Sequence, residues 1–356
     1  MTLFNLDPEH PMDHRKYVLE QVSPKDGSMV EQQPWPQPNV PATMSHTYRH
    51  YIVGGKVDSR PILIAMSGTY GPHTLHAYRA GLKPLWRTSF DPARVGGSLG
   101  SHLTPIVDID QDGSDELFVG ERCLSLRDGK ELFCCDREAW KGHSDIIQPV
   151  WHAQEKLWYI WTCRETPDTT HGPRVAMFDH TGRRVWSDLE SGHMDTGWAA
   201  RVGPAGAPMV LGVKIGNKVR TASGERRTEV VNYTYEAFTG HRVEMGFDVY
   251  TTIPVDLNGD GVHELVRGYF EGDGSVYDRT GRKLGSTGGL SAIHCKFTSQ
   301  PGEQILSYQP NGVVRIWYDR NAVDSAAAKA RYATPFYQAN RKLTGVGYNL
   351  FNLGGI

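Results

Sequence analysis

The most regular hydrophobic pattern along the chain is a pair of short apolar strands joined by an acidic loop. It runs over residues 104–120 as Thr-Pro-Ile-Val-Asp-Ile-Asp-Gln-Asp-Gly-Ser-Asp-Glu-Leu-Phe-Val-Gly, and it returns in register over residues 252–267 as Thr-Ile-Pro-Val-Asp-Leu-Asn-Gly-Asp-Gly-Val-His-Glu-Leu-Val-Arg. Two matching strand–loop–strand units so far apart in one chain are typical of a repeat protein.

A second pattern is a strand, a glycine turn and a basic-apolar strand. Glycine at the turn predicts a two-stranded hairpin, because the turn needs a positive φ. The copies cover residues 75–86, 124–133, 175–186, 235–244 and 276–284, with a degenerate copy at 314–320. The turn glycines are Gly81, Gly129, Gly182, Gly240 and Gly281.

Joined together, the two patterns give a four-stranded unit, and the turn glycines recur every 41 to 58 residues. Four strands at a period of roughly 40–50 residues predict an all-β fold, a β-propeller. Six units are visible, and residues 341–355 with part of the N-terminal arm would complete a seventh. We therefore predict seven four-stranded blades, with six or eight as alternatives. Residues 1–43 are interpreted as an arm that takes part in ring closure, and 44–356 as a single propeller catalytic domain. Only residues 322–331 have a sequence pattern that predicts a helix.

Composition narrows the function. A formal charge of −2 argues against a nucleic-acid surface, and the chain has no apolar run near the roughly 18 residues that span a bilayer. The N-terminus lacks the basic and apolar regions of a secretory signal. We expect a cytoplasmic protein, or a secreted or periplasmic form whose leader has been removed. The five cysteines form no disulfide framework and read as buried thiols. A monomer is expected.

The acidic loops carry oxygen ligands at alternate positions, which suits a hard cation such as Ca²⁺. The spacing is not that of an EF-hand, because Val119 stands where that loop needs its bidentate Glu. Loops satisfying their own backbone through Asx turns are the alternative. Either way the role is structural. The candidate ligands are Asp108, Asp110, Asp112 and Glu116 in the first loop and Asp256, Asn258, Asp260 and Glu264 in the second.

Propeller geometry places the entries into first strands and the connections from second to third strands on the same face. Several of these segments deliver His or Tyr, and imidazoles converging on one axis predict a functional site. The candidates at first-strand entries are His102, His143, His193, Tyr250 and His294. The second-to-third connections add His73, His171 and a basic run over 214–227, and Arg267 ends the strand beside Tyr250.

Imidazole, phenol and guanidinium favour β-elimination from a uronate. Elimination needs the substrate carboxylate neutralised, which Arg does bidentately, and a His or Tyr to move protons. Glycoside hydrolysis needs two carboxylic acids, and Asp145, Asp195 and Asp248 keep that alternative open. A non-catalytic glycan- or protein-binding propeller is the other alternative.

The chain resembles the β-propeller polysaccharide lyases, and most closely the seven-bladed ulvan lyases. The resemblance rests on the Asp-x-Asp-x-Asp-Gly-x-x-Glu units, on Gly-His-Met-Asp-Thr-Gly-Trp ending at Trp198, and on an ordered His, His, Tyr, Arg set. It covers most of residues 44–320. It implies a secreted enzyme that cuts an acidic, uronate-containing polysaccharide.

The resemblance also implies residue roles. His193 and Tyr250 would be the base and acid, in either order, Arg267 the neutraliser, and His171 a uronate-binding residue. His143 is a substitute for either histidine, and His73, His102, His294 and Trp198 would bind substrate. Bound Ca²⁺ or Zn²⁺ would be structural, with Cys295 beside His294 as the candidate zinc ligand.

Overall fold

A computed structural model of the chain describes residues 2–5, 9, 16–37, 49–165, 172–221, 224–269 and 271–341. The chain divides into two compact units, which are treated separately here. Unit 1 comprises Met1–Ile147, Thr181–Arg183 and Leu343–Tyr348, and unit 2 comprises Gln148–His180, Arg184–Lys342 and Asn349–Ile356.

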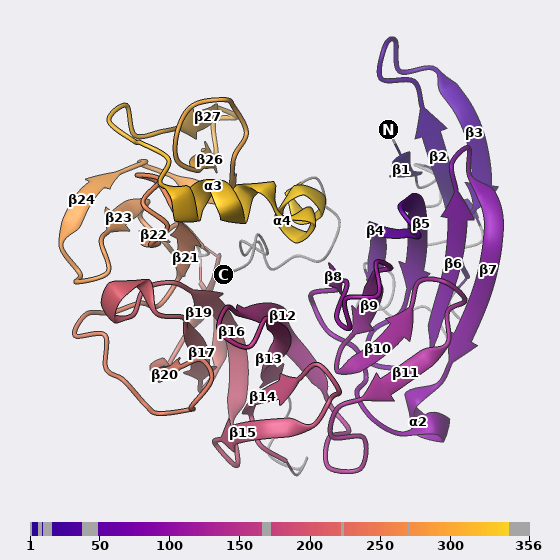
Figure 1. Cartoon of the computed structure of the whole chain (residues 1–356), viewed down its shortest axis with the longest axis horizontal. Helices are drawn as coiled ribbons and strands as arrows, with labels where there is room; N and C mark the ends of the chain where they lie inside the picture. Colours follow the sequence, from indigo (N-terminus) through magenta and orange to yellow (C-terminus); the bar gives the residue numbers. More distant parts are fainter. Residues whose placement is uncertain are drawn as a thin grey trace. The chain divides into compact units, whose positions relative to one another are not determined.

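Unit 1 is built from antiparallel sheets of consecutive strands (Figure 1). The first sheet contains β1 (Thr2–Asn5), β2 (Val18–Val22) and β3 (Met29–Pro34). The second contains β4 (His50–Val57), β5 (Arg60–Ser67), β6 (His73–Arg79) and β7 (Lys83–Phe90), and is followed by helix α2 (Pro92–Val95). The third contains β8 (Ile106–Val107), β9 (Glu116–Val119), β10 (Arg122–Ser125) and β11 (Glu131–Cys134).

Unit 2 repeats this plan, and the boundary between the units falls inside β12. One sheet contains β12 (His143–His152), β13 (Leu157–Glu165), β14 (Val175–Asp179) and β15 (Arg184–Asp188). The next contains β16 (His193–Ala200), β17 (Met209–Ile215) and β20 (Val231–Glu236), with 3-10 helix η2 (Pro204–Gly206) and a separate hairpin of β18 (Lys218–Thr221) and β19 (Gly224–Arg227).

Two more sheets and two helices complete unit 2. One sheet contains β21 (Thr252–Val255), β22 (Glu264–Arg267), β23 (Ser275–Tyr277) and β24 (Lys283–Ser286), and the other β25 (Leu290–Cys295), β26 (Gln304–Tyr308) and β27 (Val314–Trp317). Helices α3 (Ala326–Ala333) and α4 (Pro335–Asn340) follow. Helix α3 overlaps the predicted helix but begins four residues later, after Ser325 caps it, and α4 was not predicted.

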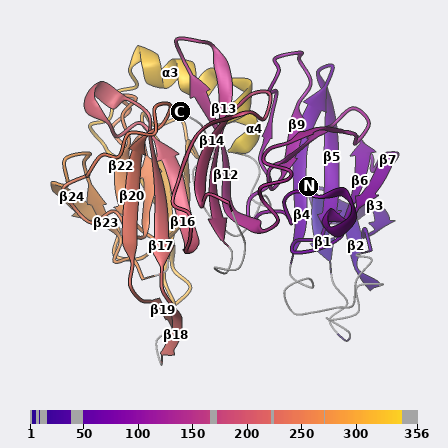
Figure 2. The same ribbon diagram turned by 90° about the horizontal axis from the view of Figure 1, so that it is seen from below.

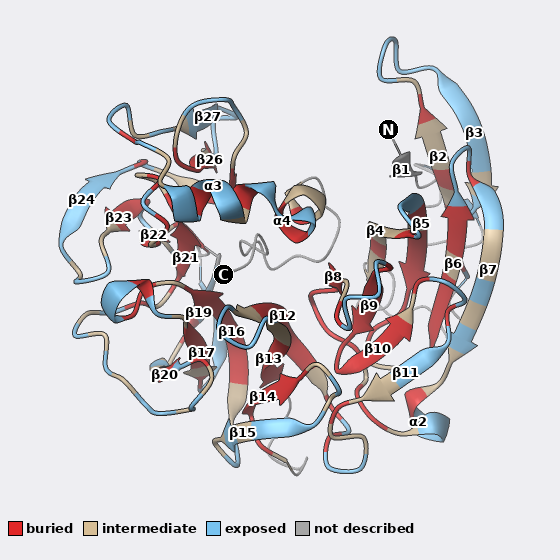
Figure 3. Cartoon of the chain, in the orientation of Figure 1, coloured by how far each residue is buried: buried red, intermediate tan, exposed pale blue. Residues whose placement is uncertain are grey.

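Burial falls from the first strand of a sheet to the last. Strand β21 is buried throughout, whereas β24 is exposed throughout, and Figure 3 shows the same trend from β13 to β15. Within unit 2 the inner strand β16 packs beside β13 of one neighbouring sheet and β21 of the other, so these sheets contact one another through their buried inner strands. Successive four-stranded meanders packed through their inner strands are the blades of a β-propeller. The predicted all-β propeller class is confirmed, and the number of blades stays a prediction.

The predicted turn glycines have positive φ, at Gly81, Gly129, Gly182, Gly240 and Gly281. Four of them, Gly129, Gly182, Gly240 and Gly281, also lie against an aromatic ring. A Cβ on Gly129 would be 2.7 Å from Trp86, and one on Gly240 would be 2.6 Å from Trp186. These positions therefore need glycine both for the turn and for packing.

The described part of the predicted arm is β-structure. Tyr17 and Trp35 are buried in a cluster with Ala65, Tyr78 and Leu82 of the β4–β7 sheet. The tail assigned to a seventh blade lies outside the described residues after Arg341, so ring closure stays a prediction. Among the described residues, none of the helices has the length and apolar character needed to cross a bilayer.

Candidate functional site

Unit 2 gathers charged side chains where β13 ends and β16 begins. Glu165 is the last residue of β13, and His193 and Asp195 lie at the start of β16. The hairpin β18–β19, which extends past the end of β17 (Figure 2), supplies Lys218 and Arg227. Because His193 pairs with Ile215 at the end of β17, the hairpin leaves the sheet beside the histidine.

The five groups form one ion network. His193 Nε2 lies 2.6 Å from Glu165 Oε1, and Lys218 Nζ lies 3.2 Å from the same oxygen. Asp195 has both oxygens occupied: Lys218 Nζ is 2.5 Å from Oδ1, and Arg227 Nε donates to Oδ2 at 2.6 Å. Asp195 is 4% exposed, so these contacts are made out of water, where each is stronger.

Protonation states follow from the network. Burial favours the neutral ring of His193, but its close contacts with the carboxylates of Asp195 and Glu165 outweigh burial and raise its pKa to about 9. Burial also opposes ionisation of Asp195, but His193, Lys218 and Arg227 together lower the pKa of that carboxyl. At neutral pH the histidine is therefore an imidazolium and a proton donor.

These residues do not fit a metal ion well. One ligand atom each from Glu165, His193 and Asp195 lies within 4.8 Å of the others, which is metal-like spacing. However, the ammonium of Lys218 and the guanidinium of Arg227 contact the same carboxylates and repel a cation. The positively charged side chains of His193, Lys218 and Arg227 instead favour an anionic ligand.

Tyr250 and Arg267 meet at Asp248 in the same unit. Arg267 Nη2 donates to Asp248 Oδ2 at 2.7 Å, and the backbone N–H of Tyr250 donates to Oδ1 at 2.9 Å. The Tyr250 hydroxyl is buried and has no hydrogen-bond partner among the described residues. Burial and then Glu271 raise the pKa of this phenol, whereas Arg227 opposes them. The charges of Arg227 and Asp195 also act on the Tyr250 phenol, so Tyr250 lies within electrostatic range of the ion network.

His193 should make stability depend on pH. Its pKa is about 9 in the folded protein and about 6.5 unfolded, so its contribution is complete below pH 6.5 and is lost as pH rises through 9. We expect His193→Gln to lower the free energy of unfolding by about 2 kcal/mol at low pH. This is less than the free energy that corresponds to the full pKa difference, because the ring is partly exposed to solvent. The deficit should vanish at high pH in urea unfolding series. The exposed His241→Gln is the control, and a deficit independent of pH would contradict the assigned ion pairs.

Unit 1 brings other predicted residues together. The Tyr70 hydroxyl accepts a hydrogen bond from Arg49 Nη2 at 3.1 Å and lies 3.3 Å from His102 Nε2. His102 Nε2 is also 3.6 Å from Asp145 Oδ1. His143 packs edge-on against Tyr70, with ring centroids 4.3 Å apart. His102 and His143 thus share a polar cluster, whose tyrosine and arginine were not predicted.

Three predicted substrate-binding residues lie in the interior. His73 is fully buried and stacks on Phe90, with centroids 4.9 Å apart. His294 is buried with Nδ1 3.0 Å from the carbonyl oxygen of Pro254, and burial lowers its pKa to about 4. Trp198 donates from Nε1 to Thr252 at 3.1 Å. These contacts give all three a packing role, and His171 lies outside the described residues.

The predicted zinc ligand is also buried. Burial raises the pKa of Cys295 to about 12, so the thiol stays protonated. Among the described residues, no group of three possible metal ligands includes His294 or Cys295.

The first acidic loop has the geometry of a cation site. Oxygens of Asp108, Asp110 and Glu116 lie within 4.8 Å of one another, and Asp108 Oδ1 is buried without a hydrogen-bond partner among the described residues. Asp112 instead accepts from the backbone N–H of Ser114 at 2.7 Å. Burial raises the pKa of Glu116 to about 8, a cost that a bound cation would offset. The residues therefore fit Ca²⁺.

The second loop satisfies its acids with protein donors. Asp256 Oδ2 accepts from Arg331 Nη2 at 3.1 Å and from the Tyr332 hydroxyl at 3.0 Å. Asn258 Nδ2 donates to Glu264 at 2.9 Å and to Asp260 at 3.2 Å. The side-chain amide of Asn258 and the guanidinium of Arg331 thus supply donors to the acidic groups of this loop.

Sequence reasoning missed Glu165, Lys218 and Glu271 as site residues. The basic run over 214–227 was the one available signal for Lys218 and Arg227. No sequence pattern marked Glu165 as a site residue, because it ends a strand that is distant in the sequence from the other members of the network.

The sheets define a β-propeller, and solved structures share this fold. Exotype rhamnogalacturonan lyase YesX aligns with a TM-score of 0.73 and 18% identity over 94% of this chain and 58% of its own. Rhamnogalacturonan lyase YesW gives 0.69 and 18% over 94% and 57%, and the Bacillus licheniformis rhamnogalacturonan lyase PL11 gives 0.71 and 18% over 94% and 57%. The chain thus spans less than two thirds of each. No protein-family model and no curated protein sequence matches it.

Proposed function

We propose that the chain is a polysaccharide lyase that cleaves a uronate-containing glycan by β-elimination. The fold is shared with three rhamnogalacturonan lyases, and the site in unit 2 supplies the groups that elimination requires. The observation that carries the proposal is the buried Tyr250 hydroxyl without a hydrogen-bond partner among the described residues, set beside the Arg227 charge. An unsatisfied buried donor is costly to the fold and is typical of a group that awaits a substrate.

In the proposed mechanism, Arg267 pairs with the substrate carboxylate and makes the C5 proton more acidic. Tyr250, as the phenolate, takes that proton, and the electron pair forms the C4–C5 double bond while the C4–O bond breaks. His193 gives its proton to the departing oxygen, because its raised pKa keeps it charged. Arg227 favours the phenolate electrostatically.

Hydrolysis fits the same residues less well. A glycosidase needs one carboxylic acid with a raised pKa and a second carboxylate able to reach the sugar or a water molecule. Asp195 has a lowered pKa and both oxygens paired with cations. Asp248 is held by Arg267 and by the backbone of Tyr250.

Incubation with rhamnogalacturonan, ulvan and other uronate polymers tests the proposal. Mass spectrometry should detect products lighter by one water than their hydrolysed counterparts, with the ultraviolet absorbance of an unsaturated uronate. Products of hydrolytic mass would indicate a glycosidase. Binding without any product would indicate a non-catalytic propeller.

We also propose a structural Ca²⁺ in the first acidic loop. Ca²⁺ at 100 times its dissociation constant should stabilise the folded protein by about 2.7 kcal/mol, which thermal unfolding measures as a rise in Tm. Asp108→Asn should abolish the rise, whereas Asp260→Asn in the second loop should keep it. A response lost in Asp260→Asn and kept in Asp108→Asn would contradict the assignment.

A further inference from the structure

The sheet of β25, β26 and β27 is one strand short of the four-stranded sheets. In those sheets the third strand lies between two neighbours, and β6, β10, β14 and β23 are mostly buried. Strand β27 is third in its sheet and has no fourth strand beside it among the described residues, so three of its four residues are exposed (Figure 3). Its outer backbone edge is therefore open to another strand.

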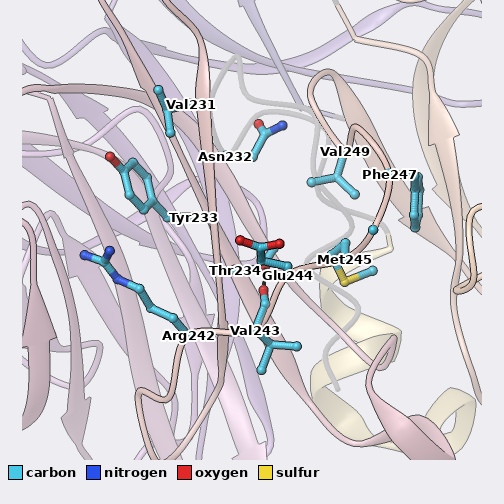
Figure 4. A pocket seen from close by; sticks show the side chains of 11 residues that line it. Val231, Asn232, Tyr233, Thr234, Arg242, Val243, Glu244, Met245, Phe247 and Val249 are labelled. Carbon is cyan, nitrogen blue, oxygen red and sulfur yellow. Dashed lines mark hydrogen bonds between the residues drawn. The ribbon is translucent and has the colours of Figure 1, made fainter.

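Strand β20 is also third in a three-stranded sheet, but its own chain returns along its edge. After the turn, the backbone N–H of Val243 donates to the carbonyl oxygen of Thr234 at 2.9 Å, and Arg242 forms a β-bridge with Tyr235. Figure 4 shows Arg242 and Val243 on the segment that runs beside β20. Residues 314–318 have no such cover, because within the described chain their backbone hydrogen bonds are confined to the ladder with β26.

One face of the β25–β27 sheet is apolar and exposed. Val314 pairs with Tyr308 and Ile316 pairs with Leu306, and directly opposite residues share a face. Val314 is 61% exposed, Ile316 is 46% exposed, and Tyr318, two residues further along, is 53% exposed. The outermost strands β11, β15 and β24 each expose a single large apolar residue. An open edge with a contiguous apolar stripe is typical of a protein–protein contact.

The charges along this edge favour a second copy of the same chain as the partner. Arg315 stacks on Trp317, with the guanidinium carbon 6.0 Å from the ring centre, and Asp319 Oδ1 accepts from the backbone N–H of Asn321 at 2.8 Å. Neither Arg315 nor Asp319 forms an ion pair with another described residue. When two β27 edges run antiparallel about a two-fold axis at Trp317, each Arg315 lies opposite the partner's Asp319. In the same register Ile316 lies opposite the partner's Tyr318, so the apolar stripes are continuous.

We propose that the chain forms a two-fold dimer in which the β27 edges of two copies pair and join their three-stranded sheets into one continuous sheet. Backbone hydrogen bonds and the apolar stripe supply the attraction, and the two Arg315–Asp319 pairs set the register. Because both copies use the same strand, the contact closes at two copies and does not grow into a fibre. This state differs from the monomer expected from the sequence. It is independent of the proposed lyase reaction, which uses none of these residues.

Sedimentation equilibrium of the full chain from about 1 to about 200 µM measures the association, since an edge contact is at the weak end of protein interfaces. We expect the mean mass to rise from monomer toward dimer with concentration. Ile316→Lys places a charge on the shared apolar face and should raise the dissociation constant at least about tenfold. Leu284→Lys on β24 is the matched control, because Leu284 is 47% exposed, and it should associate as the wild type does.

Charge reversal tests the register separately. Arg315→Asp sets like charges opposite each other and should weaken the dimer, as should Asp319→Arg, whereas the double variant restores both pairs and should recover the wild-type dissociation constant. Thermal melts report the fold of each variant, and the charge variants keep the test decisive where Ile316→Lys misfolds.

Three results would overturn the dimer: a wild type that stays monomeric throughout, an Ile316→Lys variant that associates as well as Leu284→Lys, or a double charge variant no better than the single ones. A monomer whose β27 amides exchange slowly with solvent would also overturn it. That result would assign the edge to residues 342–356 of the same chain.

Discussion

Tyr250→Phe is expected to lower kcat on the cleaved polysaccharide by about 10³-fold while leaving Tm unchanged or slightly raised. The catalytic loss follows from removing the proton acceptor. The unchanged stability follows because the hydroxyl is buried without a hydrogen-bond partner among the described residues, so deleting it leaves no donor or acceptor unpaired. Initial rates of unsaturated product and a thermal melt measure the two effects.

The pH profile separates a catalytic phenol from a packing ring. Because burial raises the pKa of Tyr250, the reactive phenolate fraction grows as pH rises. The wild-type kcat/KM should therefore increase through neutral pH and level off where His193 loses its proton, near pH 9. Tyr318→Phe, at a tyrosine that is 53% exposed, is the control and should keep both rate and profile. A Tyr250→Phe enzyme of near wild-type rate would exclude the phenol as the base.

Local patterns predicted the architecture well, because the residues that make a turn or a strand lie next to one another in the chain. The glycines at 129 and 240 have the positive φ that the hairpin pattern required. The same locality explains why the sequence alone could predict that Tyr250 and Arg267 lie near each other. Tyr250 lies just before β21, and Arg267 is the last residue of the adjacent strand β22, where it pairs with Thr252.

The rest of the site depends on contacts that no local pattern records. Glu165 meets His193 across two strands of different sheets, and Lys218 reaches Glu165 and Asp195 from a hairpin that interrupts the four-stranded unit. His73 and His294 illustrate a different effect. Their sequence positions match the functional face, but both side chains are buried, where His73 stacks on Phe90 and His294 lies beside the carbonyl oxygen of Pro254.

The two acidic loops show how one motif can serve two structural purposes. The two loops match residue by residue. In the first, a buried carboxylate oxygen of Asp108 has no hydrogen-bond partner among the described residues. In the second, Asp256 accepts a hydrogen bond from Arg331, which lies 75 residues later in the chain. Helix α3, which carries Arg331, packs on the second loop, where the side chain of Ser325 caps it through Ala328. The difference between the loops is therefore supplied by a helix outside the repeat.

Arg331→Met should be the most destabilising of the substitutions considered for unit 2. Arg331 Nη2 lies 3.1 Å from Asp256 and 3.4 Å from Glu303, and both carboxylates are fully buried. Removing one partner of a buried ion pair leaves an uncompensated charge, so we expect a loss of about 3–5 kcal/mol in the free energy of unfolding. Urea unfolding at neutral pH measures the loss.

The control on the same helix is Lys329→Met, because Lys329 is exposed and should change stability by less than about 0.5 kcal/mol. Without the guanidinium, burial raises the pKa of Asp256 further, and the variant's folded state then takes up protons as the pH falls. The deficit of Arg331→Met should therefore shrink in acid, and Asp256→Asn added to Arg331→Met should recover part of it at neutral pH. A loss no larger than that of Lys329→Met would mean that the second loop is held by something other than this ion pair, and addition of Ca²⁺ to the variant would then test whether a cation replaces it.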